Sequence, residues 1–321
     1  MEKKFFLIGS LFFFCILVSD SHHLFSQIFS PQEEIACNFL AKGQINQAIE
    51  FLEKEIPLSA RSLNLRLYLG IAYYLQGDFE KAYKELEKTD DELNDKRVSS
   101  RAPHGTSLFL MKTEREMNLS QAILSEQNEG LLYFCRGLML KDKENFINAE
   151  KKFQKARKYQ YDKASLSLQL FDLYLATDDL RSASQELALL KQALGDNATV
   201  TFLEGCFLYK NGKIDDSLAA FEKVKDSMPE AKRNIALIYY NRSDYQKASD
   251  IWMEILTLAP DDKEILIQAG LTYLYLGDRE KAQEYFNKAE ITIPPEKYSP
   301  RTFPLSLGTI AREVKFQLPC R

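Results

Sequence analysis

Small and apolar residues recur along this chain at one spacing. A small residue is followed twelve positions later by alanine or serine, and four positions after that by leucine or an aromatic residue. Clear copies are Gly70/Ala82/Leu86, Gly137/Ala149/Phe153, Gly205/Ser217/Phe221 and Gly270/Ala282/Phe286. Weaker copies are Ala36/Ala48/Leu52, Phe171/Ala183/Leu187 and Ala236/Ala248/Trp252. The middle residues lie 34 positions apart in four intervals, with one interval of 31 and one of 67, which indicates an internal repeat.

Each copy of the pattern predicts two antiparallel helices. Apolar residues between Arg66 and Leu75 fall at helical spacing. Gly77 is expected to end that helix, and Asp78 to cap the next one with its carboxylate. The small residues then allow the two helices to approach closely, so we expect Ala149, Ala183 and Ala248 to be buried. Prolines at 229, 260 and 294 stand where second helices should end, since proline cannot continue a helix.

A helix–turn–helix of 34 residues with these signatures resembles the tetratricopeptide repeat. The stretches that carry the resemblance are "LGIAY" (69–73), "AEKKF" (149–153), "SLAAF" (217–221) and "AQEYF" (282–286), together with Pro294. The resemblance implies an all-α, right-handed superhelical solenoid of antiparallel helix pairs. Each pair buries its apolar face only against its neighbours, so the same residues are required in every unit.

The repeat divides the chain into five predicted segments. Residues 1–21 form a signal peptide or N-terminal anchor, and 29–96 hold units 1 and 2. Residues 97–128 contain a loop, "RVSSRAPHGTS", followed by an atypical helical segment. Units 3 to 7 occupy 129–294, and 295–321 form a tail that is expected to dock as a cap. In that tail, Ile310, Val314 and Leu318 fit one helix face, whereas Val314, Phe316 and Leu318 fit a strand.

The N-terminus has the pattern of an export signal. Two lysines precede the apolar run "FFLIGSLFFFCILV", and polar residues follow it. This run is shorter than the roughly 20 residues that span a bilayer, which favours a cleaved signal over a retained anchor. We therefore expect an exported protein that is periplasmic, envelope-associated or secreted, and that contacts the membrane only through this segment if it is not cleaved.

Composition argues against a nucleic-acid partner, and cysteine spacing argues against a CxxC site. The net charge is −4 and no basic block stands out, so nucleic acid is not an expected partner. Past the signal segment the cysteines are Cys37, Cys135, Cys206 and Cys320, without any CxxC motif. The first three lie among apolar residues and are expected to be small core residues.

No pattern of an active site, cofactor site or metal site is present. The HExxH, GxSxG, GxGxxG and P-loop patterns are all absent. The histidines are His22, His23 and His104, and none lies inside a repeat unit. The sequence therefore predicts a non-enzymatic protein without a cofactor. The enzyme alternative would have to place a site near 97–128, at His104.

The resemblance implies that first helices line a concave groove which binds a protein or peptide. Apolar positions expected to face it are Leu67, Ile71, Phe134, Leu138, Phe202, Cys206, Ile267 and Leu271. Arg233 and Asn234 are the polar groups there, and they are too few for a clamp on a C-terminal carboxylate. Tyrosines near the ends of first helices are candidates for a contact ladder or for packing within the array; these are Tyr74, Tyr209, Tyr240 and Tyr275.

These features predict an interaction scaffold or adaptor in the cell envelope that holds a protein segment in its groove. Two alternatives stay open from the sequence. One is an enzyme, or an enzyme's regulatory subunit, with its site near 97–128. The other is a structural subunit that assembles with copies of itself.

Overall fold

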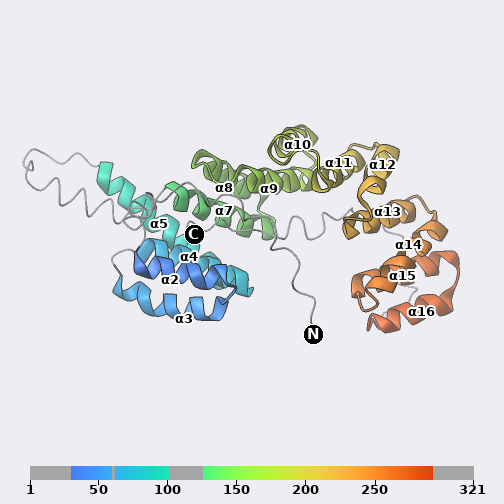
Figure 1. Ribbon diagram of the computed structural model, residues 1–321, viewed down its shortest axis with the longest axis horizontal. Coiled ribbons are helices and arrows are strands. Elements are labelled where there is room, and N and C mark those ends of the chain that lie inside the picture. Colours follow the sequence, from blue (N-terminus) through green and yellow to red (C-terminus); the bar gives the residue numbers. More distant parts are fainter. Residues whose placement is uncertain (1–29, 60–61, 102–125, 292–321) are drawn as a thin grey trace, which may run out of the picture. The chain divides into compact units, whose positions relative to one another are not determined.

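The fold consists of helices throughout the part of the chain that the structure describes. The structure is a computed structural model that describes residues 30–59, 62–101 and 126–291 (Figure 1). Over these ranges it has fourteen α-helices and one short 3-10 helix, and no strand. The predicted all-α fold is confirmed. The signal segment, the inserted stretch with His104 and the tail lie outside the described residues.

The helices follow one another in pairs that match the repeat. The first unit of sequence forms α2 (Pro31–Ala41) and α3 (Ile45–Glu55), with η1 (Ile56–Leu58) after them. The remaining helices are α4 (Ser62–Gln76), α5 (Phe79–Arg101), α7 (Glu126–Asp142), α8 (Phe146–Lys158), α9 (Lys163–Ala176), α10 (Leu180–Leu194), α11 (Ala198–Lys210), α12 (Ile214–Val224), α13 (Pro229–Asn241), α14 (Tyr245–Leu258), α15 (Lys263–Leu276) and α16 (Arg279–Lys288).

The described chain forms two compact units, each of which contains several repeats. From here on, unit 1 and unit 2 mean these two compact units. Unit 1 holds α2 to α5 and α7 as far as Met139, together with 158–160. Unit 2 holds the remainder of α7, α8 up to Arg157, and α9 to α16. Within each unit, helices that are consecutive in the sequence pack on one another, such as α4 on α5 and α13 on α14 (Figure 1). This sequential packing is what a repeat array requires.

The turn between paired helices forms as the sequence predicts. Gly77 has a φ of +91°, a left-handed conformation that glycine adopts without strain. The backbone N–H of Lys81 donates to the Asp78 carboxylate at 3.1 Å, which caps α5 and lowers the pKa of Asp78. Gly277 and Asp278 repeat both features between α15 and α16, with a φ of +84° and a 3.0 Å cap bond. The same two residues therefore build the same turn at two distant places.

The core lies where the two helices of a pair meet. The alanines at 48, 82, 149, 183, 248 and 282 are all 0% exposed, as predicted, and Ser217 is 0% exposed at the equivalent place. The Ser217 hydroxyl donates to the Gly205 carbonyl at 2.8 Å, which satisfies a polar group in this dry contact. Trp252 and Phe286 are 1% and 0% exposed. Close contact at small residues is therefore the packing rule of these pairs.

Two pairs depart from the pattern. In α9, Phe171 replaces the small residue and is fully buried, whereas Leu187 on α10 is only half-buried. In α5, the helix runs to Arg101, five residues into the stretch that the sequence analysis read as a loop from Arg97. Local turn residues do not end α5 there, because no glycine or proline occurs between 97 and 101.

The cysteines are buried, but one of them is not a free thiol. Cys135 and Cys206 are free and buried, as expected for small core residues, and burial raises the pKa of both thiols. Cys37 on α2 is 0% exposed and disulfide-bonded to a cysteine outside the described residues. Cys37 is thus a core residue as expected, and its disulfide is a feature that the sequence pattern did not predict. Cysteine spacing alone does not indicate such a bond.

The substitution Gly205→Ala tests the close contact in the α11–α12 pair. A Cβ on Gly205 would lie 2.6 Å from the Phe221 ring, so Phe221 or the helix must shift. We expect a net loss of about 1–2 kcal/mol in the free energy of unfolding, since overpacking outweighs the gain in helix propensity. Urea unfolding followed by circular dichroism measures it. The double variant Gly205→Ala/Phe221→Leu recreates the natural Ala36/Leu52 pair and should lose less than the two single losses added. An unchanged midpoint in Gly205→Ala would contradict this packing.

Candidate partner-binding surface

Three tyrosines meet where first helices end in unit 2. Tyr240 closes α13, Tyr245 opens α14 and Tyr275 lies near the end of α15. The Tyr240 ring meets the edge of Tyr245 at 5.4 Å and Tyr275 at 5.8 Å, and Tyr245 stacks on Tyr275 at 5.0 Å. Tyr240 is 4% exposed, whereas the other two are half-buried. We call these three residues the Tyr240 cluster.

A matching aromatic pair occurs in unit 1. Tyr74 near the end of α4 meets Phe79 at the start of α5 edge-on, with ring centroids 5.4 Å apart and an interplanar angle of 72°. Tyr240 and Tyr245 have the same separation in sequence, the same 5.4 Å distance and an angle of 71°. Phe79 and the adjacent Leu75 are 51% and 42% exposed. The same turn therefore presents an aromatic pair in both units, and in unit 1 that pair has open apolar surface.

Tyr209 is held by a polar contact instead of an aromatic one. It lies at the end of α11, at the same offset from its small residue as Tyr74 and Tyr240. The side-chain amide of Asn241 donates to its hydroxyl at 2.9 Å, and the ring is half-buried. Tyr275 lies five residues after the small residue of its repeat, Gly270, whereas the other three tyrosines lie four residues after theirs. The four tyrosines therefore do not share one register, although Tyr240 and Tyr275 are in contact.

Arg233 and Asn234 are engaged within unit 2. The Arg233 guanidinium forms an ion pair with Asp262 and a second one with Glu264 at 3.4 Å. Asn234 is 0% exposed, and its amide donates to the Cys206 sulfur at 3.9 Å. A ligand carboxylate would have to compete with two protein carboxylates for Arg233. The partner-binding role of both residues stays a prediction.

Most of the apolar positions expected to face a groove are part of the core. Of the eight, Ile267 is half-buried and the other seven are at most 4% exposed; those seven are Leu67, Ile71, Phe134, Leu138, Phe202, Cys206 and Leu271. Helical periodicity shows that they share a face of a first helix, but it does not show what covers that face. Exposed apolar side chains occur at several helix ends, including Leu75, Phe79 and Leu276.

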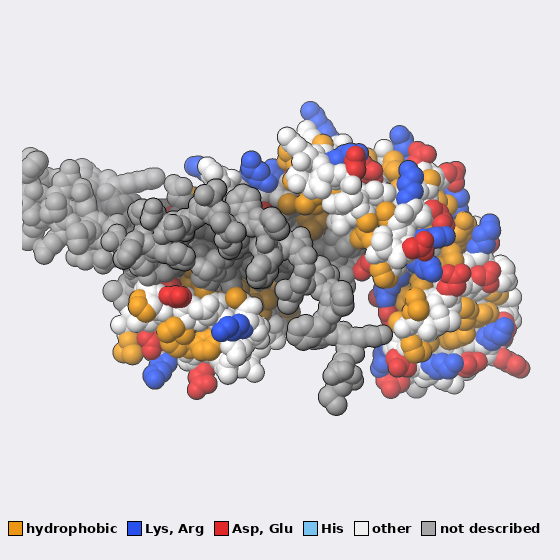
Figure 2. Space-filling view, in the orientation of Figure 1, with side chains coloured by type: hydrophobic (Ala, Val, Ile, Leu, Met, Phe, Trp, Pro, Cys, Tyr) orange, Lys and Arg blue, Asp and Glu red, His pale blue; other side chains and the backbone are white. Residues whose placement is uncertain are grey.

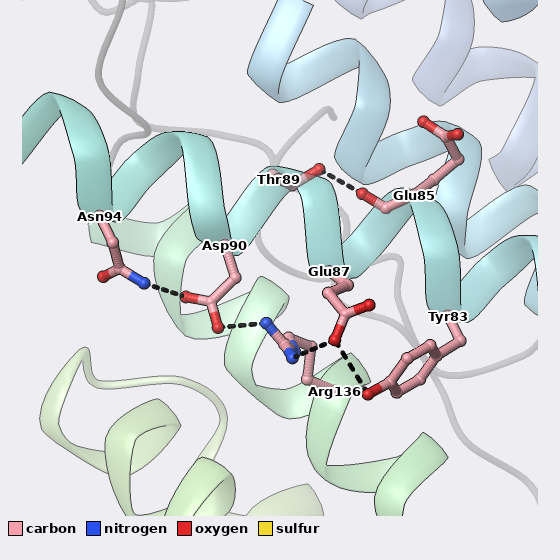
Figure 3. A network of polar contacts seen from close by, with 7 residues as sticks. All are labelled: Tyr83, Glu85, Glu87, Thr89, Asp90, Asn94 and Arg136. Carbon is pink, nitrogen blue, oxygen red and sulfur yellow. Dashed lines mark hydrogen bonds and ion pairs between the residues drawn. The ribbon is translucent and has the colours of Figure 1, made fainter.

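A polar network in unit 1 joins α5 to α7 (Figure 3). The Arg136 guanidinium forms an ion pair with Asp90 and lies 3.9 Å from Glu87. Asn94 donates to Asp90 at 3.3 Å, and Tyr83 donates to Glu87 at 3.1 Å. Asp90 is 2% exposed. The network therefore joins the two helices that flank the stretch 102–125. Its charged and polar side chains pair with one another.

Sequence reasoning missed this network, although the sequence contains a signal for it. Arg136 directly precedes Gly137, where α4, α9 and α13 have the buried Leu69, Leu170 and Ile235, although α11 has the partly exposed Glu204 and α2 the exposed Ile35 at that place. A charged residue at a core position indicates a buried partner. The partner itself, Asp90, lies 46 residues earlier and has no distinguishing pattern.

The substitution Arg136→Met tests this ion pair. It leaves Asp90 buried without its cation, and we expect the free energy of unfolding to fall by about 3–5 kcal/mol. The matched control is Lys210→Met, which removes the exposed 2.7 Å pair with Asp178 and should change stability by at most about 1 kcal/mol. Guanidinium unfolding of both variants measures the difference. Equal losses would show that burial of the Asp90 pair does not matter.

The described surface of unit 2 has charges of both signs and includes a cavity lined by charged and apolar side chains. Acidic and basic side chains are interspersed over the helices from α12 to α16 on the face shown in Figure 2. A cavity of about 250 Å³ lies between α12, α13 and α14. Its three lysines each pair with a carboxylate: Lys225 with Glu222, Lys232 with Glu254 and Lys247 with Asp244. The cavity is therefore balanced in charge.

The described residues offer neither a cluster of metal ligands nor a helix that could cross a membrane. Residues 30–59, 62–101 and 126–291 contain no group of three or more His, Cys, Asp or Glu side chains placed to hold a metal ion. The described helices are each too short or too polar to cross a bilayer. His104, on which the enzyme alternative depends, lies outside these residues.

The substitution Tyr240→Ala tests whether the Tyr240 cluster is a packing contact. Since Tyr240 is 4% exposed, removing its ring should cost about 3–5 kcal/mol of stability. Burial raises the pKa of the Tyr240 hydroxyl, and the neighbouring Tyr275 and Tyr245 raise it further. The substitution Tyr240→Phe keeps the ring and removes only this hydroxyl, so it should cost about 1 kcal/mol. Thermal unfolding compares the two variants. A loss below about 1 kcal/mol in Tyr240→Ala would favour an exposed contact ladder instead.

Comparisons with known proteins agree with the repeat and the fold. Sequence profiles of the tetratricopeptide repeat match residues 202–263 and 264–290. The chain is 26% identical to the human protein O-mannosyl-transferase TMTC3 over 77% of its own length and 29% of the relative's. It is 25% identical to the BBSome complex member BBS4 homolog of Drosophila melanogaster over 63% of its length and 45% of the relative's. The chain thus spans less than half the length of either protein.

Solved structures show the same helix-pair architecture. A tetratricopeptide repeat protein from Parabacteroides merdae superposes with a TM-score of 0.59 at 15% identity, covering 83% of this chain and 93% of that one. The APC/C hetero-tetramer Cut9–Hcn1 superposes with a TM-score of 0.54 at 11% identity, covering 79% and 44%. These identities support the fold and no more. The matched profiles thus identify tetratricopeptide repeats at residues 202–290, and the described helix pairs have the fold of a tetratricopeptide-repeat array.

Proposed function

We propose that this chain is a non-enzymatic scaffold that binds a segment of another protein at the ends of its first helices. The observation that carries the proposal is the aromatic pair Tyr74–Phe79, in which Phe79 is 51% exposed beside the 42% exposed Leu75. Aromatic and aliphatic side chains of this kind supply most of the binding energy at protein interfaces. Repeats of this family generally bind proteins, which supports the same reading.

The names of the similar proteins support an interaction role and leave an enzyme as the alternative. One relative is, by its name, a member of a complex, and one similar structure is a hetero-tetramer. The other relative is named as a transferase, but this chain covers only 29% of it. Among the described residues there is no group of three or more His, Cys, Asp or Glu placed to hold a metal ion, and His104 lies outside them. Fold alone does not assign a function, so the test must measure binding directly.

We also propose that the protein is exported. Two observations support this location. The N-terminal run of apolar residues after two lysines has the form of a signal segment. Cys37 is disulfide-bonded, and structural disulfides form mainly in oxidising compartments outside the cytosol. The cell envelope is the location that fits an adaptor of this kind, by analogy with its family.

Co-purification from the native cell with chemical crosslinking tests the scaffold function. We expect a protein partner whose crosslinks fall near the ends of α4 and α11. With that partner, Phe79→Ala should weaken binding by about thirtyfold or more, the loss typical of an interface anchor, with little change in unfolding temperature. The matched control is Ile147→Ala, which removes an apolar side chain that is 71% exposed at the start of α8. Equal affinity of the Phe79→Ala variant and wild type would contradict the proposed contact.

Two other experimental outcomes would favour an alternative to the proposed scaffold function. Sedimentation velocity at two concentrations that showed growth of the species with concentration, without any partner, would favour self-assembly. Turnover of a sugar or peptide substrate that is lost in His104→Ala would favour the enzyme alternative.

N-terminal sequencing of the native protein tests export. Cleavage of the signal should leave a mature chain that begins near Asp20 or His22. A chain that still begins at Met1 in the membrane fraction would instead support a retained anchor. Met1 in the soluble cytoplasmic fraction would contradict export.

A further inference from the structure

The Tyr240 cluster shows what covers an aromatic pair at the turn of a repeat. Tyr245 opens α14, and Tyr275 of the next repeat stacks on it, with ring centroids 5.0 Å apart and an interplanar angle of 16°. Tyr240 meets both of these rings edge-on. Stacked and edge-to-face contacts at such distances are the favoured arrangements of aromatic rings. In unit 2, therefore, the chain itself supplies a third ring to the pair Tyr240–Tyr245.

Phe79 has in unit 1 the place that Tyr245 has in unit 2. Each of the two opens a second helix, and each lies five residues after the tyrosine that meets it edge-on, Tyr74 or Tyr240. The ring centroids are 5.4 Å apart in both pairs, and the interplanar angles are 72° and 71°. The two pairs thus have one geometry, so the third ring of unit 2 shows how a further ring fits on Phe79.

No third ring stacks on Phe79 in the part of the chain that the structure describes. Tyr74 is the only described ring in contact with it. In the next copy of the repeat pattern, which begins at Gly137, the residue at the offset of Tyr275 is Asp142, and this side chain is not aromatic. Phe79 is 51% exposed, whereas its equivalent in unit 2 is half-buried beneath Tyr275. The face of Phe79 that a third ring would cover is therefore accessible.

The surroundings of Phe79 favour an apolar contact. Leu75 of the same turn is 42% exposed and adds aliphatic surface. Asp78 and Lys81 of this turn pair with each other at 3.0 Å, so each charge already has a partner. An aliphatic side chain placed on Phe79 would gain from burial alone, whereas a ring would also gain from stacking. The turn is therefore best suited to an aromatic side chain.

We infer that the protein partner inserts an aromatic side chain, which stacks on Phe79 as Tyr275 stacks on Tyr245. This inference rests on the proposed scaffold function and names the chemistry of the partner at that site. The inserted phenylalanine, tyrosine or tryptophan takes the place that a residue of the chain itself has in unit 2, and Leu75 adds apolar contact beside it. At this turn the bound segment thus continues the packing that the repeats make with one another.

Peptide selection on the full-length protein tests the chemistry of the occupant. Random peptides displayed on phage are selected on the wild type, and clones that bind the Phe79→Ala variant equally well are discarded. The remaining peptides should share one aromatic position. Cyclohexylalanine at that position keeps the size of the side chain but removes its π-system, and it should weaken binding by about two- to tenfold. Fluorescence anisotropy of labelled synthetic peptides measures these affinities.

Two further variants separate stacking from simple burial. Phe79→Leu keeps an apolar side chain without a ring, so the aromatic and cyclohexyl peptides should bind it equally. Phe79→Tyr reproduces the Tyr240–Tyr245 pair and should bind the aromatic peptide within about twofold of the wild type. The matched control Ile147→Ala removes a 71% exposed apolar side chain elsewhere and should leave every affinity unchanged. Thermal unfolding checks that each variant is folded.

The outcomes distinguish this inference from the proposed function. Peptides that depend on Phe79 but bind as tightly with cyclohexylalanine or leucine at the shared position would overturn the aromatic occupant, and the protein contact at Phe79 would stand. If binding of the selected peptides never depends on Phe79, both the contact and the aromatic occupant are overturned. Sedimentation velocity that showed a dimer which Phe79→Ala dissociates would assign the surface to a second copy of the chain and overturn the inference.

Discussion

The close approach of two helices at a small residue is the contact on which the rest of this structure depends. An aromatic ring or leucine of the second helix lies directly over the backbone of Gly70, Gly205 or Gly270, and an added Cβ would lie 2.6–2.8 Å from it. This contact removes apolar surface from water along the whole pair and leaves no room for a larger side chain at the crossing. Because each helix pair has the same requirement, the chain repeats the same residues.

The aromatic pairs follow from that packing. A first helix ends and a second begins within a turn held by a left-handed residue and an aspartate cap, so the residues on either side of the turn are neighbours in space. In two such turns those neighbours are aromatic, at the same distance and nearly the same angle. One pair is buried against the next repeat by Tyr275, and the other has an exposed phenylalanine. A single local geometry is thus packed against the next repeat in one unit and leaves a phenylalanine exposed in the other.

Polar contacts carry the information that apolar packing lacks. Apolar faces of neighbouring repeats are alike, so they do not by themselves specify which helix lies against which. The Asp90–Arg136 pair joins α5 to α7 across an insertion, and the Glu33–Asn64–Asn128 row joins α2, α4 and α7. A buried charge or amide left without its partner destabilises the fold by several kcal/mol, of order 3–5 for an ion pair. These contacts therefore favour one arrangement of the helices of unit 1.

The periodicity of small and apolar residues was sufficient to predict the helix pairs, their turns and the buried alanines, because each depends on residues within one repeat. The candidate surface was predicted only in part. Periodicity placed Tyr240 and Asn234 on the first helices, but their burial depends on side chains from the next repeat, such as Tyr275, or from the previous one, such as Cys206. The Asp90–Arg136 pair joins residues that are 46 positions apart in the sequence. No local spacing encodes such contacts, and only the packing of whole repeats brings their atoms together.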